Sequence, residues 1–211
     1  NAQDKNHLAG KIIRVNEDTG DYKLVSMGHR NQQGIYYDKA NDIIFSTEHG
    51  PKGGDEININ QLSIDEGKIK NYGWGNSSYG EHYDLSEEFK KKVYANCPLK
   101  KSHSEFGFQE PVKYFVPSIA ITQIIKENSF INNKDFIETI YFTSLGYTNK
   151  DGRRSFHKID LRKNNDFFDI VEHEYVVLND RIRDMIYIKN KNLFVLFLEL
   201  SGSIAMISLY K

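Results

Sequence analysis

Short runs of apolar residues recur along the whole chain, and each run is bounded by Gly, Asn or Asp. Val, Ile, Tyr and Phe dominate these runs, and such residues favour a pleated, half-buried surface, whereas Gly, Asn and Asp favour tight turns. The pattern therefore predicts an all-β chain. The expected strands are Lys11–Val15, Tyr22–Met27, Gly34–Tyr37, Ile43–Thr47, Glu56–Ile59, Thr122–Ile125, Thr139–Ser144, Phe156–Leu161, Tyr175–Leu178, Arg183–Ile188, Leu193–Leu198 and Ile204–Leu209.

Helical periodicity is weak between these runs, and Leu85–Val93 is the one segment where a short helix is predicted. This segment lies in a long polar stretch, residues 75–110, that separates two groups of expected strands. A stretch of this length without clear strands usually projects from the surface. We expect it to be an insertion loop.

The expected strands form a unit that occurs three times. In residues 34–59, 122–161 and 184–209, a strand, a connection and a second strand are followed by a third apolar strand. Such units are typical of β-propeller blades, in which each sheet buries its face against the next. A β-sandwich produces the same alternation, so periodicity alone leaves both architectures open.

Charge and cysteine content narrow the classes of partner. The chain has 28 basic and 29 acidic residues and a net charge of −1, so it lacks the concentrated positive charge that nucleic acid or an anionic membrane requires. The single cysteine, Cys97, cannot form an internal disulfide. No apolar run approaches the roughly 20 residues of a membrane-spanning helix. The first residues carry neither an initiating Met nor a signal peptide, and we expect the sequence to begin inside a longer chain.

Two polar loops follow predicted strands and are candidates for a site. Gly28–Gly34 (GHRNQQG) carries five consecutive polar side chains, and Thr47–Glu56 (TEHGPKGGDE) carries three glycines and one proline. Glycine allows main-chain carbonyls to turn toward a ligand or a hard cation, and Pro51 fixes its own φ. Loops at the ends of strands are where a β scaffold presents a site. We expect these loops to form the rim of one.

A third candidate is Asp180–Asp184 (DRIRD), in which an extended backbone sends Arg181 and Arg183 to one face. Two neighbouring guanidiniums repel each other unless an anion lies between them. They form either a clamp for a polyanionic small molecule or a structural network neutralised by Asp180, Asp184 and glutamates. The pattern leaves both interpretations open.

These segments resemble the later part of the soluble quinoprotein sugar dehydrogenases, the glucose/sorbosone dehydrogenase family, and especially its aldose sugar dehydrogenase branch. The order and spacing of the matching segments span nearly the whole chain. They are Asn1–Asp4, Leu8–Arg14, Gly28–Gly34, Thr47–Asn58, Asn71–Trp74, Glu110–Pro111, Pro117–Ala120 and Arg181–Asp184.

The resemblance implies a six-bladed β-propeller, of which residues 1–211 form roughly the later three to four blades. It also implies pyrroloquinoline quinone (PQQ) near the propeller axis, with a calcium ion (Ca²⁺) beside it. Asn31 would hydrogen-bond the quinone, and His49 would contact the cofactor. The backbone carbonyls of Gly50 and Pro51 would bind calcium. Arg181 and Arg183 would hold the carboxylates of PQQ.

The activity implied is oxidation of aldose sugars at C1 to lactones, with an external electron acceptor and a periplasmic or secreted location. The catalytic histidine of the family lies upstream of anything that resembles residue 1, so no general base is assigned to this chain. A propeller without its first blades should expose apolar faces on its end sheets. N-terminal blades or a partner chain would cover them.

One position departs from the family pattern and keeps alternatives open. Relatives carry a lysine that pairs with the quinone where this chain has Gly146, and Lys150 or Arg153 would have to reach back to replace it. One alternative is therefore a non-catalytic propeller that binds sugar or protein. Another is a calcium-dependent lactonase that uses Asn31, Asp55 and Glu56 as ligands.

Several other residues receive structural interpretations. His29 is expected to order the loop that presents Asn31, and Tyr72 and Trp74 are interpreted as core anchors more than as walls of a sugar entrance. Cys97 is expected to be inert.

Overall fold

The computed structural model of the chain describes residues 1–65, 67–84, 86–127, 137–165 and 167–209, which are mostly β-structure. They form two compact units. Unit 1 comprises residues 1–32, 37–44 and 48–118, and unit 2 comprises residues 33–36 and 45–47 together with the chain from Ile119 onward.

The first sheet of unit 1 is formed by β1 (Lys11–Val15), β2 (Tyr22–Met27) and the short strand β6 (Lys70–Asn71). β1 and β2 pair antiparallel, and β6 runs parallel to β2. Gly20, in the turn between β1 and β2, has a φ of 75°, a conformation that glycine adopts without strain.

A second sheet contains β3 (Gln32–Asp38), β4 (Ile43–Glu48), β5 (Asp55–Gln61) and β7 (Lys113–Phe115), in that order. Residues of β3 and β4 belong to both units. Every residue of β4 and β5 is buried, although β5 alternates polar and apolar side chains. Buried polar groups require hydrogen-bond partners, so β5 must find such partners within the fold.

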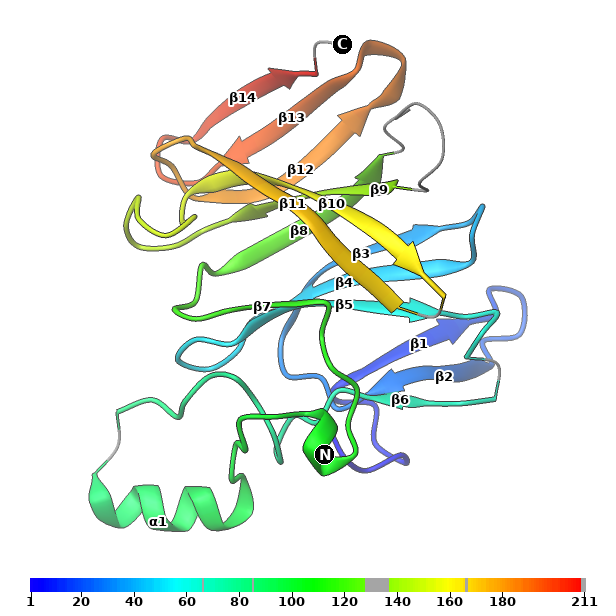
Figure 1. Cartoon of the computed structure of the whole chain (residues 1–211), viewed down its shortest axis with the longest axis vertical. Coiled ribbons are helices and arrows are strands. Elements are labelled where there is room, and N and C mark those ends of the chain that lie inside the picture. Colours follow the sequence, from blue (N-terminus) through cyan, green and yellow to red (C-terminus); the bar gives the residue numbers. More distant parts are fainter. Residues whose placement is uncertain (66, 85, 128–136, 166, 210–211) are drawn as a thin grey trace. The chain divides into compact units, whose positions relative to one another are not determined.

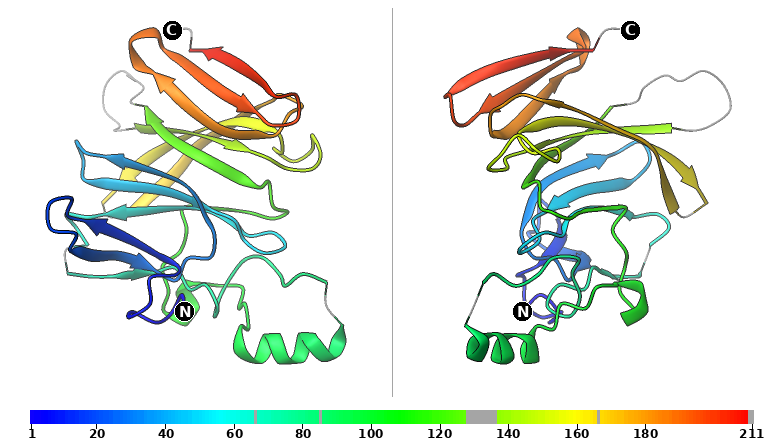
Figure 2. Two further views of the ribbon diagram at one scale, coloured as in Figure 1. Left: turned by 180° about the vertical axis from the view of Figure 1, so that it is seen from behind. Right: turned by 60° about the vertical axis from the view of Figure 1, so that its left-hand side comes forward.

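The polar stretch 75–110 contains helix α1 (Glu87–Asn96) and a 3₁₀ turn at Ser104–Phe106. The hydroxyl of Ser86 accepts a hydrogen bond from the backbone N–H of Phe89, which caps the first turn of α1. No residue of α1 is buried, and the views of Figure 2 show the helix standing away from the strands of unit 1. The predicted helix is confirmed, shifted by a few residues toward the C-terminus; Leu85 lies outside the described residues.

Unit 2 contains two antiparallel meanders. The first consists of β8 (Ile121–Glu127), β9 (Ile137–Ser144), β10 (Ser155–Asn164) and β11 (Phe167–Val177), and the second consists of β12 (Ile182–Ile188), β13 (Leu193–Leu198) and β14 (Ser203–Ser208). Figure 1 shows β12, β13 and β14 as three neighbouring strands in orange to red. Consecutive strands are neighbours in both sheets.

Period-two alternation divides the side chains of the second meander between its two faces. One face packs into the core of unit 2, where Met185, Phe194 and Leu196 lie against Tyr141 and Phe156. A further link between the two meanders is the Thr122 hydroxyl, which donates a hydrogen bond to the carbonyl of Ile182 at 2.9 Å.

The other face of the second meander is apolar and exposed. Phe197 lies opposite Ile204 in the register, and Met206 lies opposite Val195. Ile204 and Met206 are 64% and 70% exposed. Exposed apolar side chains therefore gather on one face of β14.

In all three predicted repeat units the strands are sequential neighbours in their sheets, and those of the second and third units pair antiparallel. The expected strands are confirmed with small shifts at their ends, except that β11 begins eight residues earlier than Tyr175. The short strands β6 and β7 were not predicted. Among the described residues, no helix has the length and apolar content needed to cross a bilayer.

His157 in β10 is fully buried and is held as a neutral imidazole. Its Nε2–H donates to the carbonyl of Gly152 at 2.7 Å, and its Nδ1 accepts from Nε2 of His173 at 3.1 Å. The ring also stacks on Phe142, with centroids 4.5 Å apart. Burial, together with the nearby His173, lowers the pKa of His157 to about 3.

This lowered pKa predicts that acid destabilises the protein through His157. Below its ordinary pKa of about 6.5, the unfolded chain binds a proton that the folded chain excludes, so stability falls by about 1.4 kcal/mol per pH unit toward pH 3. We expect the wild type to lose about 2 kcal/mol more than His157→Gln between pH 6.5 and 5. Urea unfolding of both proteins at each pH measures the difference. Parallel pH curves would contradict the assignment.

Candidate functional site

The carboxylate of Glu48 holds the loop Gly28–Gly34 in place. It accepts hydrogen bonds from His29 Nδ1 at 2.7 Å, from Gln32 Nε2 at 2.8 Å and from the backbone N–H of Arg30 at 3.2 Å. A carboxylate oxygen accepts this hydrogen bond, so Nδ1 of His29 is the donor. Three donors from one short loop therefore meet on one buried anion.

His29 is itself built into the core of unit 1. Its Nε2 lies 2.8 Å from the hydroxyl of Ser26, and its ring stacks on Tyr72 with centroids 4.8 Å apart. His29 and Tyr72 are each 1% exposed. The structure thus confirms that His29 orders the loop and that Tyr72 is a core anchor.

Arg30 links the two polar loops, and sequence reasoning did not single it out. Its Nη1 donates to the carbonyls of His49 at 3.1 Å and Gly50 at 2.9 Å. Its guanidinium carbon lies 5.2 Å from the ring centroid of Trp74, a cation–π geometry. Its position between two residues already selected, His29 and Asn31, is the signal that could have found it.

Asn31 lies at the exposed tip of this loop, next to the second loop. Its carbonyl accepts a hydrogen bond from the backbone N–H of His49 at 2.9 Å, so the structure brings together Asn31, His49 and Gly50. The Nε2 atom of His49 is buried and has no hydrogen-bond partner among the described residues. A buried ring nitrogen without a partner is costly, and a bound polar group would satisfy it.

The glycines of the second loop have a packing role in addition to any ligand role. A Cβ on Gly50 would lie 2.1 Å from the carbonyl oxygen of Gly53, and a Cβ on Gly54 would lie 2.3 Å from the backbone nitrogen of Gly80. Asp55 closes this turn, because its Oδ1 accepts from the N–H of Gly50 at 3.2 Å. Any side chain at these positions would push the turn apart.

The donor chemistry of this turn suits a hard cation. Ca²⁺ prefers oxygen ligands, and backbone carbonyls are among them. Within the described part of the chain, no hydrogen bond reaches the carbonyl of Pro51, while that of Gly50 already accepts from Arg30. Across the described residues, no three histidine, cysteine or carboxylate side chains gather to hold a metal ion. A calcium ion here would rely on carbonyl oxygens.

Asp55 and Glu56 face different partners. The hydroxyl of Ser118 donates to both carboxylate oxygens of Asp55, at 2.8 and 2.7 Å. Glu56 Oε1 instead lies 3.2 Å from Nε2 of His103, and its Oε2 accepts from Asn58 at 3.3 Å. Burial raises the pKa of Glu56, and this effect is opposed by the nearby His103 and by the hydrogen bond from Asn58. These contacts give no support to a shared calcium site on Asn31, Asp55 and Glu56.

Arg181 and Arg183, in unit 2, converge on one carboxylate. Arg183 donates through Nε and Nη2 to Oε2 of Glu199, at 3.0 and 2.6 Å, and Arg181 donates through Nε to Oε1 at 3.3 Å. Ile182, between them, is fully buried. The predicted placement on one face is confirmed, and the neutralising group is a glutamate.

The two flanking aspartates have other tasks. Asp180 accepts from the backbone N–H groups of Leu200 and Ser201, at 2.8 and 3.0 Å. Asp184 accepts from the N–H of Met185 at 2.8 Å. Within the described residues, the carboxylate part of the structural-network interpretation is therefore met by Glu199 and not by Asp180 or Asp184.

Arg153 fills the space beside Gly146. A Cβ on Gly146 would lie 2.3 Å from Cβ of Arg153. The Arg153 guanidinium contacts Thr148 and Asp151, at 3.3 and 3.2 Å. Of the two residues expected to reach back toward this position, Arg153 therefore packs its aliphatic stem against Gly146, while its guanidinium turns to Thr148 and Asp151.

Comparison with known proteins matches residues 1–206 to the sequence profile of a family described as Glucose / Sorbosone dehydrogenase. The chain belongs to this family. It is 33% identical over 141 residues to aldose sugar dehydrogenase YliI of Escherichia coli, covering 61% of this chain and 34% of that protein. It is 26% identical over 188 residues to quinoprotein glucose dehydrogenase B of Acinetobacter calcoaceticus, covering 74% of this chain and 37% of that protein.

Solved structures agree on the fold of this glucose/sorbosone dehydrogenase family chain. A crystal structure of glucose dehydrogenase covers the whole chain with a TM-score of 0.68 at 22% identity, and 57% of that protein is covered in turn. The chain thus spans little more than a third of the length of the two curated relatives and somewhat over half of the solved structure.

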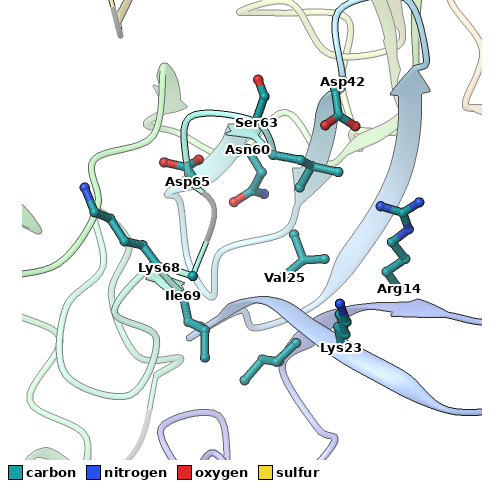
Figure 3. A pocket seen from close by; sticks show the side chains of 12 residues that line it. Arg14, Lys23, Val25, Asp42, Asn60, Ser63, Asp65, Lys68 and Ile69 are labelled. Atoms are coloured by element: carbon teal, nitrogen blue, oxygen red, sulfur yellow. The ribbon is translucent and has the colours of Figure 1, made fainter.

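A separate hollow of about 730 Å³ lies in unit 1 of this family member (Figure 3). Arg14 and Lys23, cross-strand neighbours on β1 and β2, line the hollow together with Lys68 and the acidic residues Asp42 and Asp65. Asp42 accepts from the hydroxyl of Tyr37, and Asp65 pairs with a lysine. None of the predicted cofactor residues lines this hollow.

The contacts of Glu48 predict that this side chain stabilises the fold and the loop Gly28–Gly34. Glu48→Gln should reduce the free energy of unfolding by about 3 kcal/mol, because a neutral amide cannot replace a buried anion that serves three donors. Amide hydrogen exchange in residues 28–34 should also accelerate. Urea unfolding and hydrogen-exchange mass spectrometry measure the two effects. The exposed Glu17→Gln is the control, and equal behaviour of both variants would refute the role of Glu48.

Proposed function

We propose that the protein is a PQQ- and calcium-dependent dehydrogenase that oxidises aldose sugars at C1 to lactones. In this proposal the chain forms the later blades of a six-bladed β-propeller. The observation that carries it is the placement of Arg181 and Arg183 on one face, with the buried Ile182 between them. Family membership over residues 1–206 gives that geometry its context.

The predicted residues are chemically suited to hold the two groups. Arginine forks match carboxylates, and PQQ carries three of them, so Arg181 and Arg183 are the proposed carboxylate clamp. Asn31, at the exposed tip of its loop, and His49, with its unpartnered Nε2, are the proposed hydrogen-bonding contacts. The carbonyls of Gly50 and Pro51 are the proposed calcium ligands.

Bound PQQ would supply the chemistry that side chains lack, acceptance of a hydride from C1 of the sugar. The chain's own contribution is binding and orientation. The arginines neutralise negative charge at the clamp, and Glu48 fixes the loop that presents Asn31. We propose in addition, from the family resemblance, an external electron acceptor and a periplasmic or secreted location.

A second candidate is a non-catalytic propeller that binds sugar or protein. It is favoured by Gly146, which has no side chain at the position where relatives carry a cation, and where Arg153 packs instead. This candidate keeps the scaffold and the polar loops but predicts no electron transfer.

Reconstitution of the intact protein with PQQ and Ca²⁺ tests the proposal. We expect reduction of a dye acceptor when aldoses are added, and loss of that activity when calcium is chelated. The double variant Arg181→Ala/Arg183→Ala should weaken PQQ binding at least about 100-fold, because each charge-assisted contact contributes about 1.5–3 kcal/mol. Equilibrium dialysis measures the binding.

The matched control is Arg14→Ala, which removes an arginine that is not part of the clamp. It should leave PQQ binding unchanged. Sugar binding by calorimetry without any dye reduction would favour the non-catalytic candidate. PQQ binding that is equally strong in the wild type and the double variant would exclude the clamp.

A further inference from the structure

Glu199 occupies a turn whose backbone is fixed independently of its side chain. This turn joins β13 to β14, and the N–H of Glu199 donates to the carbonyl of Arg181 at 2.8 Å. The next two N–H groups, of Leu200 and Ser201, are held by Asp180. The Glu199 carboxylate is therefore delivered to the arginines by a turn that does not need that carboxylate for its own hydrogen bonds.

The carboxylate binds mainly the Nε edges of the two guanidiniums. It uses Nε of both arginines and Nη2 of Arg183. The terminal Nη1 of Arg181 has only a long contact of 3.5 Å to the carbonyl of Gly146, and its guanidinium carbon lies 5.2 Å from the ring centroid of Tyr147. Terminal nitrogens thus retain capacity for a further acceptor.

The charges and the exposed fractions of Arg181, Arg183 and Glu199 also bear on whether a ligand can reach the arginines. The side chains of Arg181, Arg183 and Glu199 carry two positive charges and one negative charge, while Asp180 and Asp184 direct their carboxylates to backbone N–H groups. The side chains of Arg183 and Glu199 are 53% and 37% exposed, while that of Arg181 is 17% exposed. The cluster is open to solvent on the side of Arg183.

We propose that Glu199 is a positioning residue for the arginine clamp. Its carboxylate lies between the two guanidiniums, screens their mutual repulsion and holds them by their Nε edges, so that terminal nitrogens face an anionic ligand. The identity of that ligand as PQQ rests on the proposed function; the alignment of the arginines does not.

The surroundings of Glu199 favour the ionised form that a positioning role requires. Partial desolvation alone would raise its pKa, but the hydrogen bond from Arg183 and the charges of both arginines outweigh this effect and lower the pKa. The opposite role, a carboxylate that competes with the ligand for the clamp, predicts the opposite sign when Glu199 is removed. The sign of the effect therefore separates the two roles.

The first experiment measures PQQ binding to the intact protein by equilibrium dialysis. Glu199→Gln should bind PQQ about ten-fold more weakly than the wild type, since it loses the charge that aligns the forks. Glu199→Asp, which keeps the charge, should recover part of the loss. The control is Glu174→Gln, which breaks an exposed glutamate–lysine pair elsewhere in unit 2. Tighter or unchanged binding by Glu199→Gln would overturn the proposal.

The second experiment needs no cofactor. In ¹⁵N-labelled protein, the Nε–H signals of Arg181 and Arg183 should be resolved by NMR in the wild type and in Glu174→Gln, and should broaden or collapse in Glu199→Gln. If the wild type binds no PQQ, the proposed function fails, while these signals still decide whether Glu199 fixes the two side chains. Unchanged signals in Glu199→Gln would refute the positioning role.

Discussion

A single buried carboxylate, that of Glu48, is the constraint on which the first polar loop depends. Three donors of that loop meet on it, and it is only 4% exposed. A buried anion must be satisfied by donors, and a short polar loop needs a fixed acceptor to stay in one conformation. Each therefore stabilises the other. Because Asn31 and Arg30 belong to this loop, their positions beside His49 and Gly50 follow from the same interaction.

The second polar loop obtains its shape from backbone packing. Gly54 presses against Gly80 so closely that no side chain fits, and Asp55 ties the turn back to Gly50. The direction of the carbonyl groups at the turn is thus a consequence of tight packing. The same geometry that satisfies the fold leaves the Pro51 carbonyl with no hydrogen bond within the described chain, which is why a packing role and a ligand role are compatible here.

Local sequence patterns predicted the strands well, because alternation and turn residues are local signals. The repeat of three strand units and the short helix in the insertion were visible for the same reason. The first part of β11 was missed because Phe167–Val171 reads as a mixed, half-exposed segment, and β7 was missed because it has only three residues. In the site, Arg181 and Arg183 were correctly placed on one face, but Glu199 was not foreseen as their partner. Glu48 was not foreseen as the acceptor that holds the loop Gly28–Gly34. Each lies 16 to 19 residues from the groups it binds, a distance that only the fold closes.

Glu48 and Glu199 differ in burial, and this difference separates a role in stability from a role in ligand binding. Glu48 is buried, so its removal leaves hydrogen-bond donors unsatisfied in the core and lowers the free energy of unfolding. Glu199 is more than a third exposed, and ion pairs at such positions contribute little to folding because water and salt screen them. An exposed carboxylate that nevertheless binds Arg183 of β12 and Arg181 just before it therefore has little stabilising value to account for its position. What it changes is the direction in which the guanidiniums point, and that direction matters to a ligand more than to the fold.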